Sequence, residues 1–184
     1  EDDDPPRLPA STLVERAAGE VWSGPRVFKG GSHIKIVWTY GVMSTVALKT
    51  AAKTGYPRDK LLGVWWAGSE EDVIPAADAA KGYVSASFTA SGTNFPVMQD
   101  IKNKVYGAGK GNLEDKTRLG NVMYTRGVVY GMIVVEALRI AQAKYGKGKV
   151  MTPEQLRWGF EHLNLTEARI KELGAAGLFP PIKT

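Results

Sequence analysis

The sequence predicts an α/β fold in which a parallel sheet with flanking helices is followed by a helical C-terminal part. Two observations lead to this prediction. Between residues 34 and 88, strand-like apolar runs alternate with helical runs, and after residue 96 the apolar residues recur at helical spacing. Strands that alternate with helices form parallel sheets, because each helix carries the chain back to the edge where the next strand starts. Such sheets bind ligands just beyond the carboxyl ends of their strands.

Three strands are expected in the first part of the chain, with two helical runs between them. The strands cover residues 34–40, 61–66 and 82–88, and the helical runs cover residues 44–53 and 76–81. β-Branched and aromatic residues dominate the first strand, as is typical of strands. The sequence Thr-Gly-Tyr-Pro follows the first helix and ends it, because glycine and proline interrupt regular structure.

The remaining predicted elements are helices. They cover residues 96–106, 121–145, about 153–163 and 166–173. The third of these has a strong start, with Thr152 as a hydroxyl cap, proline at the first helical position and Gln155 placed for a capping box. The run 121–145 carries a broad apolar face, which indicates burial between layers.

Composition excludes several classes of function. The chain has 184 residues, of which 43% are hydrophobic and 23% charged, with a formal net charge of +5. Its lysines are spread among acidic residues and form no basic stripe, so no nucleic-acid partner is expected. The absence of cysteine excludes disulfides and thiolate chemistry. No apolar run approaches the length of a membrane span, and the acidic start has no features of a signal peptide.

No catalytic, metal or cofactor site is predicted. The glycine-rich stretches 106–111 and 145–149 follow helices, so helix termination is favoured over phosphate binding. His33 and His162 have no second ligand at metal-binding spacing. The acidic run 70–72 is more typical of a solvated loop or a helix cap than of a general base.

Aromatic residues at the predicted strand ends are the candidates for ligand contact. Tyr40 ends the first strand, is followed by glycine, and offers both an apolar ring and a hydroxyl. Trp65 and Trp66 end the second strand. Alternate strand residues face opposite sides of a sheet, so one of the two tryptophans is expected to face away from whatever the other covers. Packing of the tryptophans beneath neighbouring helices is the alternative interpretation.

These runs resemble a known family, the type I periplasmic solute-binding proteins of ABC importers. The similar branch serves branched-chain amino acids (the leucine, isoleucine and valine type). The resemblance covers residues 34 to 184 and depends on the order and spacing of several runs: residues 37–43, 47–55, 62–68, 78–83, 124–130 and 136–138.

The resemblance implies two Rossmann-like lobes that close on a small solute. It places Tyr40 where the family offers a tyrosine to the ligand's ammonium group, and Trp65 where amino-acid binders usually carry a glutamate. A buried ammonium without a carboxylate partner is costly. Glu70 is therefore a substitute partner, and a small carboxylate or amide fits as well as an amino acid. The expected ligand contacts are Thr39, Tyr40, Trp65, Trp66 and Glu70.

The resemblance also divides the chain into three parts. Residues 1–33 are an irregular or foreign segment, residues 34–115 form a unit of the second lobe, and residues 116–184 form helices that normally pack on the first lobe. The chain is then a fragment, so weak binding is expected. The apolar face of the 121–145 helix has no expected partner within the chain, and such a face favours self-association into a homo-oligomer.

The expected function is therefore solute capture in the bacterial periplasm, with a small-molecule solute and the ABC transporter membrane permease subunits as partners. No enzymatic activity and no cofactor are expected. The alternatives are a self-associating interaction module and an α/β enzyme or ligand sensor without a transport role.

Overall fold

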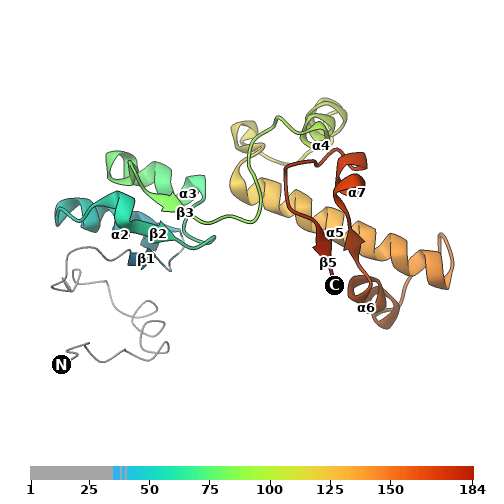
Figure 1. The fold of residues 1–184 in the computed structure, drawn as a ribbon. Helices are drawn as coiled ribbons and strands as arrows, with labels where there is room; N and C mark the ends of the chain where they lie inside the picture. The colour runs from blue at the N-terminus through green and yellow to red at the C-terminus, as the bar shows by residue number, and fades with distance from the viewer. Residues whose placement is uncertain (1–34, 38, 40) are drawn as a thin grey trace, which may run out of the picture. The chain divides into compact units, whose positions relative to one another are not determined.

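The fold is seen in a computed structural model that describes residues 35–37, 39 and 41–184 (Figure 1). The expected N-terminal segment 1–33 and the predicted ligand contact Tyr40 lie outside the described residues. Within the described part of the chain, no helix combines the length and apolar character that a membrane span requires.

The chain divides into two compact units between Ala86 and Ser87, which are called unit 1 and unit 2 below. The sequence predicts a boundary elsewhere, between residues 115 and 116, where the resemblance divides the chain between two lobes of a longer protein. That boundary stays a prediction.

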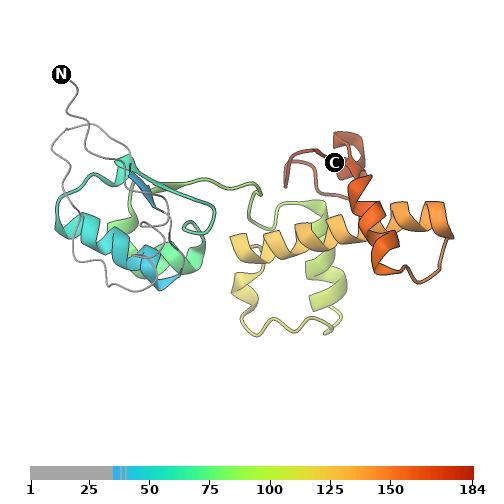
Figure 2. The same cartoon turned by 90° about the horizontal axis from the view of Figure 1, so that it is seen from below.

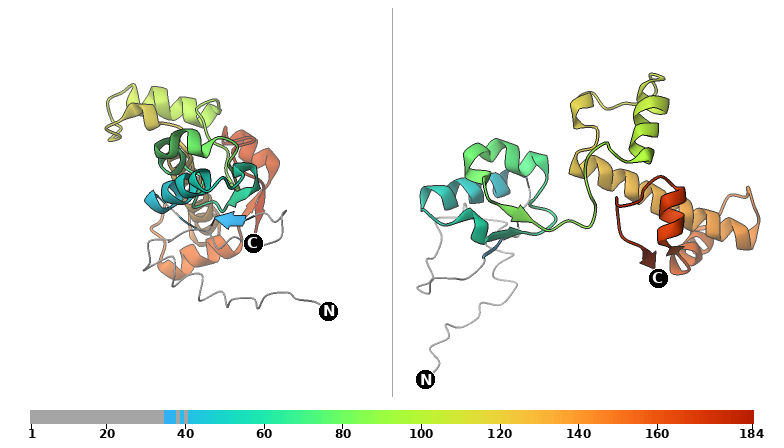
Figure 3. Two further views of the ribbon diagram at one scale, coloured as in Figure 1. Left: turned by 90° about the vertical axis from the view of Figure 1, so that its left-hand side faces the viewer. Right: turned by 45° about the horizontal axis from the view of Figure 1, so that its top comes forward.

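Unit 1 alternates strands with helices (Figures 1 and 3). Its elements in chain order are β1 (Lys35–Val37), α2 (Val42–Lys53), η1 (Arg58–Lys60), β2 (Leu61–Gly63), α3 (Glu70–Val73), η2 (Ile74–Ala80) and β3 (Val84–Ser85). The strands lie in the order β1-β2-β3, and both pairs are parallel. The predicted α/β fold with a parallel sheet is therefore confirmed.

Helix α2 begins where the chain can reverse direction after β1. Gly41 precedes the helix with φ 55° and ψ −133°, a conformation that glycine adopts readily and other residues avoid. Thr54 ends the helix and donates from its backbone amide to the Thr50 carbonyl oxygen at 3.0 Å. The buried residues of α2 recur at helical spacing and form the face that packs on the rest of unit 1. They are Ser44, Thr45, Leu48 and Ala51.

The strands of unit 1 are shorter than the sequence predicts. The second strand was expected to run through Trp66, but β2 ends at Gly63. The amide of Ala67 donates to the carbonyl oxygen of Val64 at 2.9 Å, which closes a turn over the two tryptophans. The second helical run, predicted at 76–81, begins earlier as η2, and Ala77 interrupts it with φ 50°.

The core of unit 1 is small and lies around α2. Leu48 is fully buried, and it clusters with Val37 and Leu61 from the sheet and with three buried alanines from the helices and loops. This core fixes the sheet against α2, so the loops that follow β1 and β2 are held at one edge.

Unit 2 is mainly helical. Its elements in chain order are α4 (Pro96–Asp100), continued by the π-helical turn η3 (Ile101–Tyr106), then η4 (Lys116–Arg118), α5 (Val122–Tyr145), α6 (Pro153–Glu161), β4 (Asn164–Leu165), α7 (Glu167–Glu172) and β5 (Ile182–Lys183). The capping box predicted at Thr152 is present, and the backbone amide of Gln155 donates to the Thr152 hydroxyl at 3.3 Å. The two short strands pair antiparallel.

The long helix α5 is the axis of unit 2, and α6 packs across it (Figures 1 and 2). A Cβ atom at Gly159 of α6 would overlap the Ala137 carbonyl oxygen, so glycine permits this close approach. Buried residues of α5 and of the C-terminal segment form one core: Val129, Ala137, Leu163, Leu165, Ile170, Ala175, Leu178 and Phe179.

This core corrects one expectation. The apolar face of the 121–145 helix was expected to lack a partner within the chain, but Val129 and Ala137 are buried by the segment that follows α5. The C-terminal residues fold back onto the helix because they carry an apolar face of their own. Val134 and Val135 nevertheless remain 45% and 61% exposed.

Candidate functional site

The candidate site of unit 1 lies at the carboxyl ends of its parallel strands. Val37 pairs with Gly63, and Gly63 pairs with Ser85, so the residues after these positions leave the sheet at the same edge. Thr39 and Trp65 each lie two residues beyond the paired positions. The structure therefore brings together the β1–α2 and β2–α3 loops, as the sequence predicts for a parallel sheet.

The first loop offers hydroxyl groups. Thr39 is half-buried, and its hydroxyl lies 2.9 Å from the Ser44 hydroxyl in the first turn of α2. Ser44 itself is fully buried. Thr39 is therefore the hydroxyl that can reach a polar ligand group at this edge, and the buried Ser44 hydroxyl holds it in place.

The second loop presents the two tryptophans. Trp66 is 47% exposed and Trp65 is partly buried. Because both lie in a turn and not in a strand, the prediction that they face opposite sides of a sheet does not apply to them. Their ring centroids lie 5.8 Å apart with 43° between the planes, so the two rings contact one another. Together they form an apolar aromatic surface.

The acidic run after the tryptophans forms a helix cap. The Asp72 carboxylate accepts from the backbone amide of Ser69 at 2.9 Å and from its hydroxyl at 2.8 Å. Thr45 donates its hydroxyl to the Asp72 carbonyl oxygen at 2.8 Å, which ties α2 to α3. Glu70 is the first residue of α3 and is partly buried. Asp72 therefore takes part in a helix cap, which is one of the two interpretations that the sequence favours for the acidic run.

Tyr83 supports this loop from the third strand side. Its hydroxyl donates to the Ala67 carbonyl oxygen at 2.8 Å. Burial, together with the charge of Asp72, raises the pKa of Tyr83 to about 12, so the phenol stays neutral and remains a donor at physiological pH. A Cβ atom at Gly63 would overlap this hydroxyl, which explains the glycine at the end of β2.

The described residues of this edge offer groups of the kinds that bind small solutes. They combine an aromatic surface with hydroxyl groups and one carboxylate, a composition typical of small-molecule sites. No cluster of metal-ligating side chains occurs among the residues that the structure describes. Sequence reasoning did not place Ser44 and Tyr83 at this edge, and it considered Asp72 only as part of the acidic run 70–72. Ser44 follows the end of the first predicted strand, whereas Tyr83 lies near the start of the third predicted strand, so its role has no such signal in the sequence.

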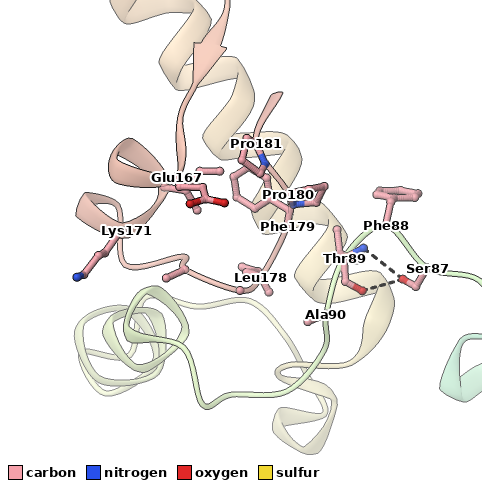
Figure 4. A pocket seen from close by; sticks show the side chains of 13 residues that line it. Ser87, Phe88, Thr89, Ala90, Glu167, Lys171, Leu178, Phe179, Pro180 and Pro181 are labelled. Atoms are coloured by element: carbon pink, nitrogen blue, oxygen red, sulfur yellow. Dashed lines mark hydrogen bonds between the residues drawn. The ribbon is translucent and has the colours of Figure 1, made fainter. Parts of the chain in front are cut away.

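A separate pocket of about 770 Å³ lies in unit 2 (Figure 4). The segments 87–90 and 176–181 line it, with Glu167 and Lys171 from α7. The Ser87 hydroxyl donates to the Thr89 carbonyl oxygen at 2.7 Å and fixes the first segment. All of the pocket's lining residues belong to unit 2.

Solved structures similar to the chain come from ABC transporters. One is described as an ABC transporter permease from the Pseudomonas fluorescens group, with 42% identity and a TM-score of 0.76 over 80% of this chain. Another is an ABC transporter substrate-binding protein from Aeropyrum pernix (16% identity, TM-score 0.57, 81% of this chain). A third is a branched-chain amino acid ABC transporter from Thermus thermophilus with bound valine (23% identity, TM-score 0.53, 84% of this chain).

These similarities confirm the α/β fold and the resemblance to the solute-binding proteins of ABC importers that the sequence indicates. The two structures with lower identity support the fold alone. The chain spans 35% of the first structure and 36% of each of the others. No family model and no curated protein matches the chain.

Proposed function

We propose that this chain forms part of the solute-binding component of an ABC importer. The solute is a branched-chain amino acid or a related small carboxylate or amide. The partners are the membrane permease subunits of the importer, and the location is the bacterial periplasm. The observation that carries this proposal is the 42% identity, at a TM-score of 0.76, to a solved ABC transporter protein.

The site geometry supports a solute-binding role. Trp65 and Trp66 supply apolar ring surfaces, and Thr39 with Ser44 supplies hydroxyl groups at the same edge of the sheet. Glu70 is the proposed partner for an ammonium group. No enzymatic role is proposed, because the similar structures are described as transport proteins.

The isolated chain is expected to bind weakly. It spans 35% of the ABC transporter structure with which it shares 42% identity, and a solute held on one wall of a cleft keeps much of its surface in water. We expect dissociation constants of about millimolar order for valine, 3-methylbutanoate and 3-methylbutanamide.

The test is a titration of the isolated chain followed by NMR, with the three solutes compared. The indole resonances of Trp65 and Trp66 should shift and saturate, and Trp65→Ala should abolish the shift at Trp66. Trp158→Ala is the matched control, because Trp158 belongs to unit 2, where it packs on Tyr145 and His162. Indole shifts that persist unchanged in Trp65→Ala, or no saturable shift with any solute, would contradict the site.

Self-association is a second candidate function. It is favoured by Val134 and Val135, which remain 45% and 61% exposed on α5, and by an apolar groove of about 360 Å³ beside Val135. Light scattering tests it: a homo-oligomer that Val135→Asp converts to a monomer would support the proposal. A wild-type chain that stays monomeric at all concentrations would overturn it.

A further inference from the structure

Arg126 is a buried cation with no carboxylate partner among the residues that the structure describes. It lies in the second turn of α5 and is 4% exposed. Its Nη1 donates to the Met123 sulfur at 3.8 Å, and a thioether is a weak acceptor. Its Nε is buried and has no acceptor. The guanidinium therefore has five N–H donors and only one weak acceptor within the described residues.

The arginines farther along the same unit are bound differently. Arg169 donates to both carboxylate oxygens of Glu136, at 3.0 Å and 2.7 Å, and Arg139 donates to the same carboxylate at 3.0 Å. Burying a charge is costly unless it is paired and hydrogen-bonded. Within unit 2, the buried charge of Glu136 is paired with two arginines and hydrogen-bonded to both. The buried guanidinium of Arg126 has no such anionic partner in this unit.

One aromatic ring lies beside this guanidinium, and a second ring stacks on the first. Its carbon atom Cζ is 5.0 Å from the centroid of the Phe88 ring, and Phe88 stacks on Tyr130 with centroids 6.3 Å apart. Phe88 and Tyr130 are 41% and 52% exposed. A buried cation thus lies next to aromatic surface that is open to solvent. Phe88 also belongs to a segment without helix or strand (Figure 4).

We propose that Arg126, Phe88 and Tyr130 form a binding site for a small organic carboxylate with an apolar tail. The planar guanidinium fork matches a carboxylate in a bidentate geometry, and the rings match the tail. A phosphate dianion fits less well, because one guanidinium would leave much of its charge uncompensated. The inference rests on the proposed function only in taking the bound molecule to be a small solute, and its residues lie in unit 2.

Phenylacetate is the probe, and phenylacetamide is its neutral counterpart of nearly the same shape. In NMR titrations of the full chain at constant ionic strength, phenylacetate should shift the amide resonances of residues 87–90 and 123–130 and saturate. Phenylacetamide should not. Arg126→Met should abolish the shifts, and Arg126→Lys should weaken binding about tenfold, because lysine keeps the charge but lacks the fork.

The matched control is Arg157→Met, which removes an exposed arginine paired with Glu161 on α6. It should titrate like the wild type. Equal binding of the amide and the acid, unchanged binding in Arg126→Met, or no saturable shift in the wild type would each overturn the proposal. If Arg126→Met does not fold, the lysine variant decides: affinity equal to the wild type overturns the proposal. The tryptophan resonances of unit 1 report separately on the proposed transport site.

Discussion

Helix α5 carries a buried charged side chain in each of two regions, and these two side chains differ in whether a partner of opposite charge lies beside them. Near the middle of the helix, Glu136 is 2% exposed and is held by Arg139 of the next turn and by Arg169 of α7. Near the start of the helix, Arg126 is 4% exposed and pairs with no carboxylate in the described part of the chain. Both charges lost their hydration on folding, but only the first region replaced it. A satisfied buried charge indicates a structural role, and an unsatisfied one points to a missing partner.

The largest effect on the free energy of unfolding is expected in the region around Glu136. Arg169→Met removes both hydrogen bonds between Arg169 and Glu136 and leaves the buried carboxylate with Arg139 alone, whose side chain is 54% exposed. Breaking a buried pair on one side is strongly destabilising, so we expect the free energy of unfolding to fall by about 3 kcal/mol. Denaturant unfolding followed by far-UV circular dichroism measures this change.

Arg157→Met is the control for this experiment. Its ion pair with Glu161 lies on the surface, so its loss should cost about 0.5 kcal/mol or less. Equal losses in the two variants would show that Glu136 does not depend on Arg169, and the comparison along α5 would fail.

The pH dependence of stability gives a smaller effect of the same pair. The hydrogen bond from Arg169, aided by Arg139, holds the pKa of Glu136 below its ordinary value, although burial opposes this. The unfolded chain then binds a proton more readily than the folded chain, so stability rises with pH in this range. The contribution of Glu136 is fully present above the ordinary pKa of about 4.5 and is lost as pH falls toward the lower folded value.

Glu136→Gln tests this directly. The variant should be less stable than the wild type at neutral pH, and the difference should shrink as pH falls below about 4.5. The exposed carboxylates Asp115 and Glu154 also have lowered pKa values, but they are present in both proteins and cancel in the difference. A difference that stays constant with pH would exclude Glu136 as the titrating group.

The sequence predicts the fold better than the site. Alternating runs are enough to predict the parallel sheet and the helices α2, α5 and α6, because periodicity and caps are local signals. Strand ends depend on pairing with distant residues: β2 pairs with β1 and β3 only as far as Gly63, so Trp65 and Trp66 lie in the turn that follows and not in the strand. The predicted contacts Thr39 and Trp65 leave the sheet at one edge because strand pairing places them there.

The buried charges of α5 could not be predicted from the sequence. Glu136 and Arg169 are 33 positions apart, and only the packing of α7 on α5 brings them together. Arg126 lies in an ordinary helical pattern, and the Phe88 ring that its guanidinium contacts comes from a distant part of the sequence. Long-range packing of this kind leaves no spacing signal in a single sequence.

The smallest effect on stability is expected for a substitution of Arg126. Its sign distinguishes the region around Arg126 from the region around Glu136. Arg126→Met keeps most of the side-chain volume and removes a charge that has only the Met123 sulfur and the Phe88 ring beside it. Replacing an uncompensated buried charge by an apolar group is neutral or stabilising, so the free energy of unfolding should stay within about 1 kcal/mol of the wild type or rise. Denaturant unfolding in a buffer without carboxylates measures it, beside Arg169→Met. A loss as large as that of Arg169→Met would mean that Arg126 is already satisfied within the chain, and its charge would then have the same structural role as that of Glu136.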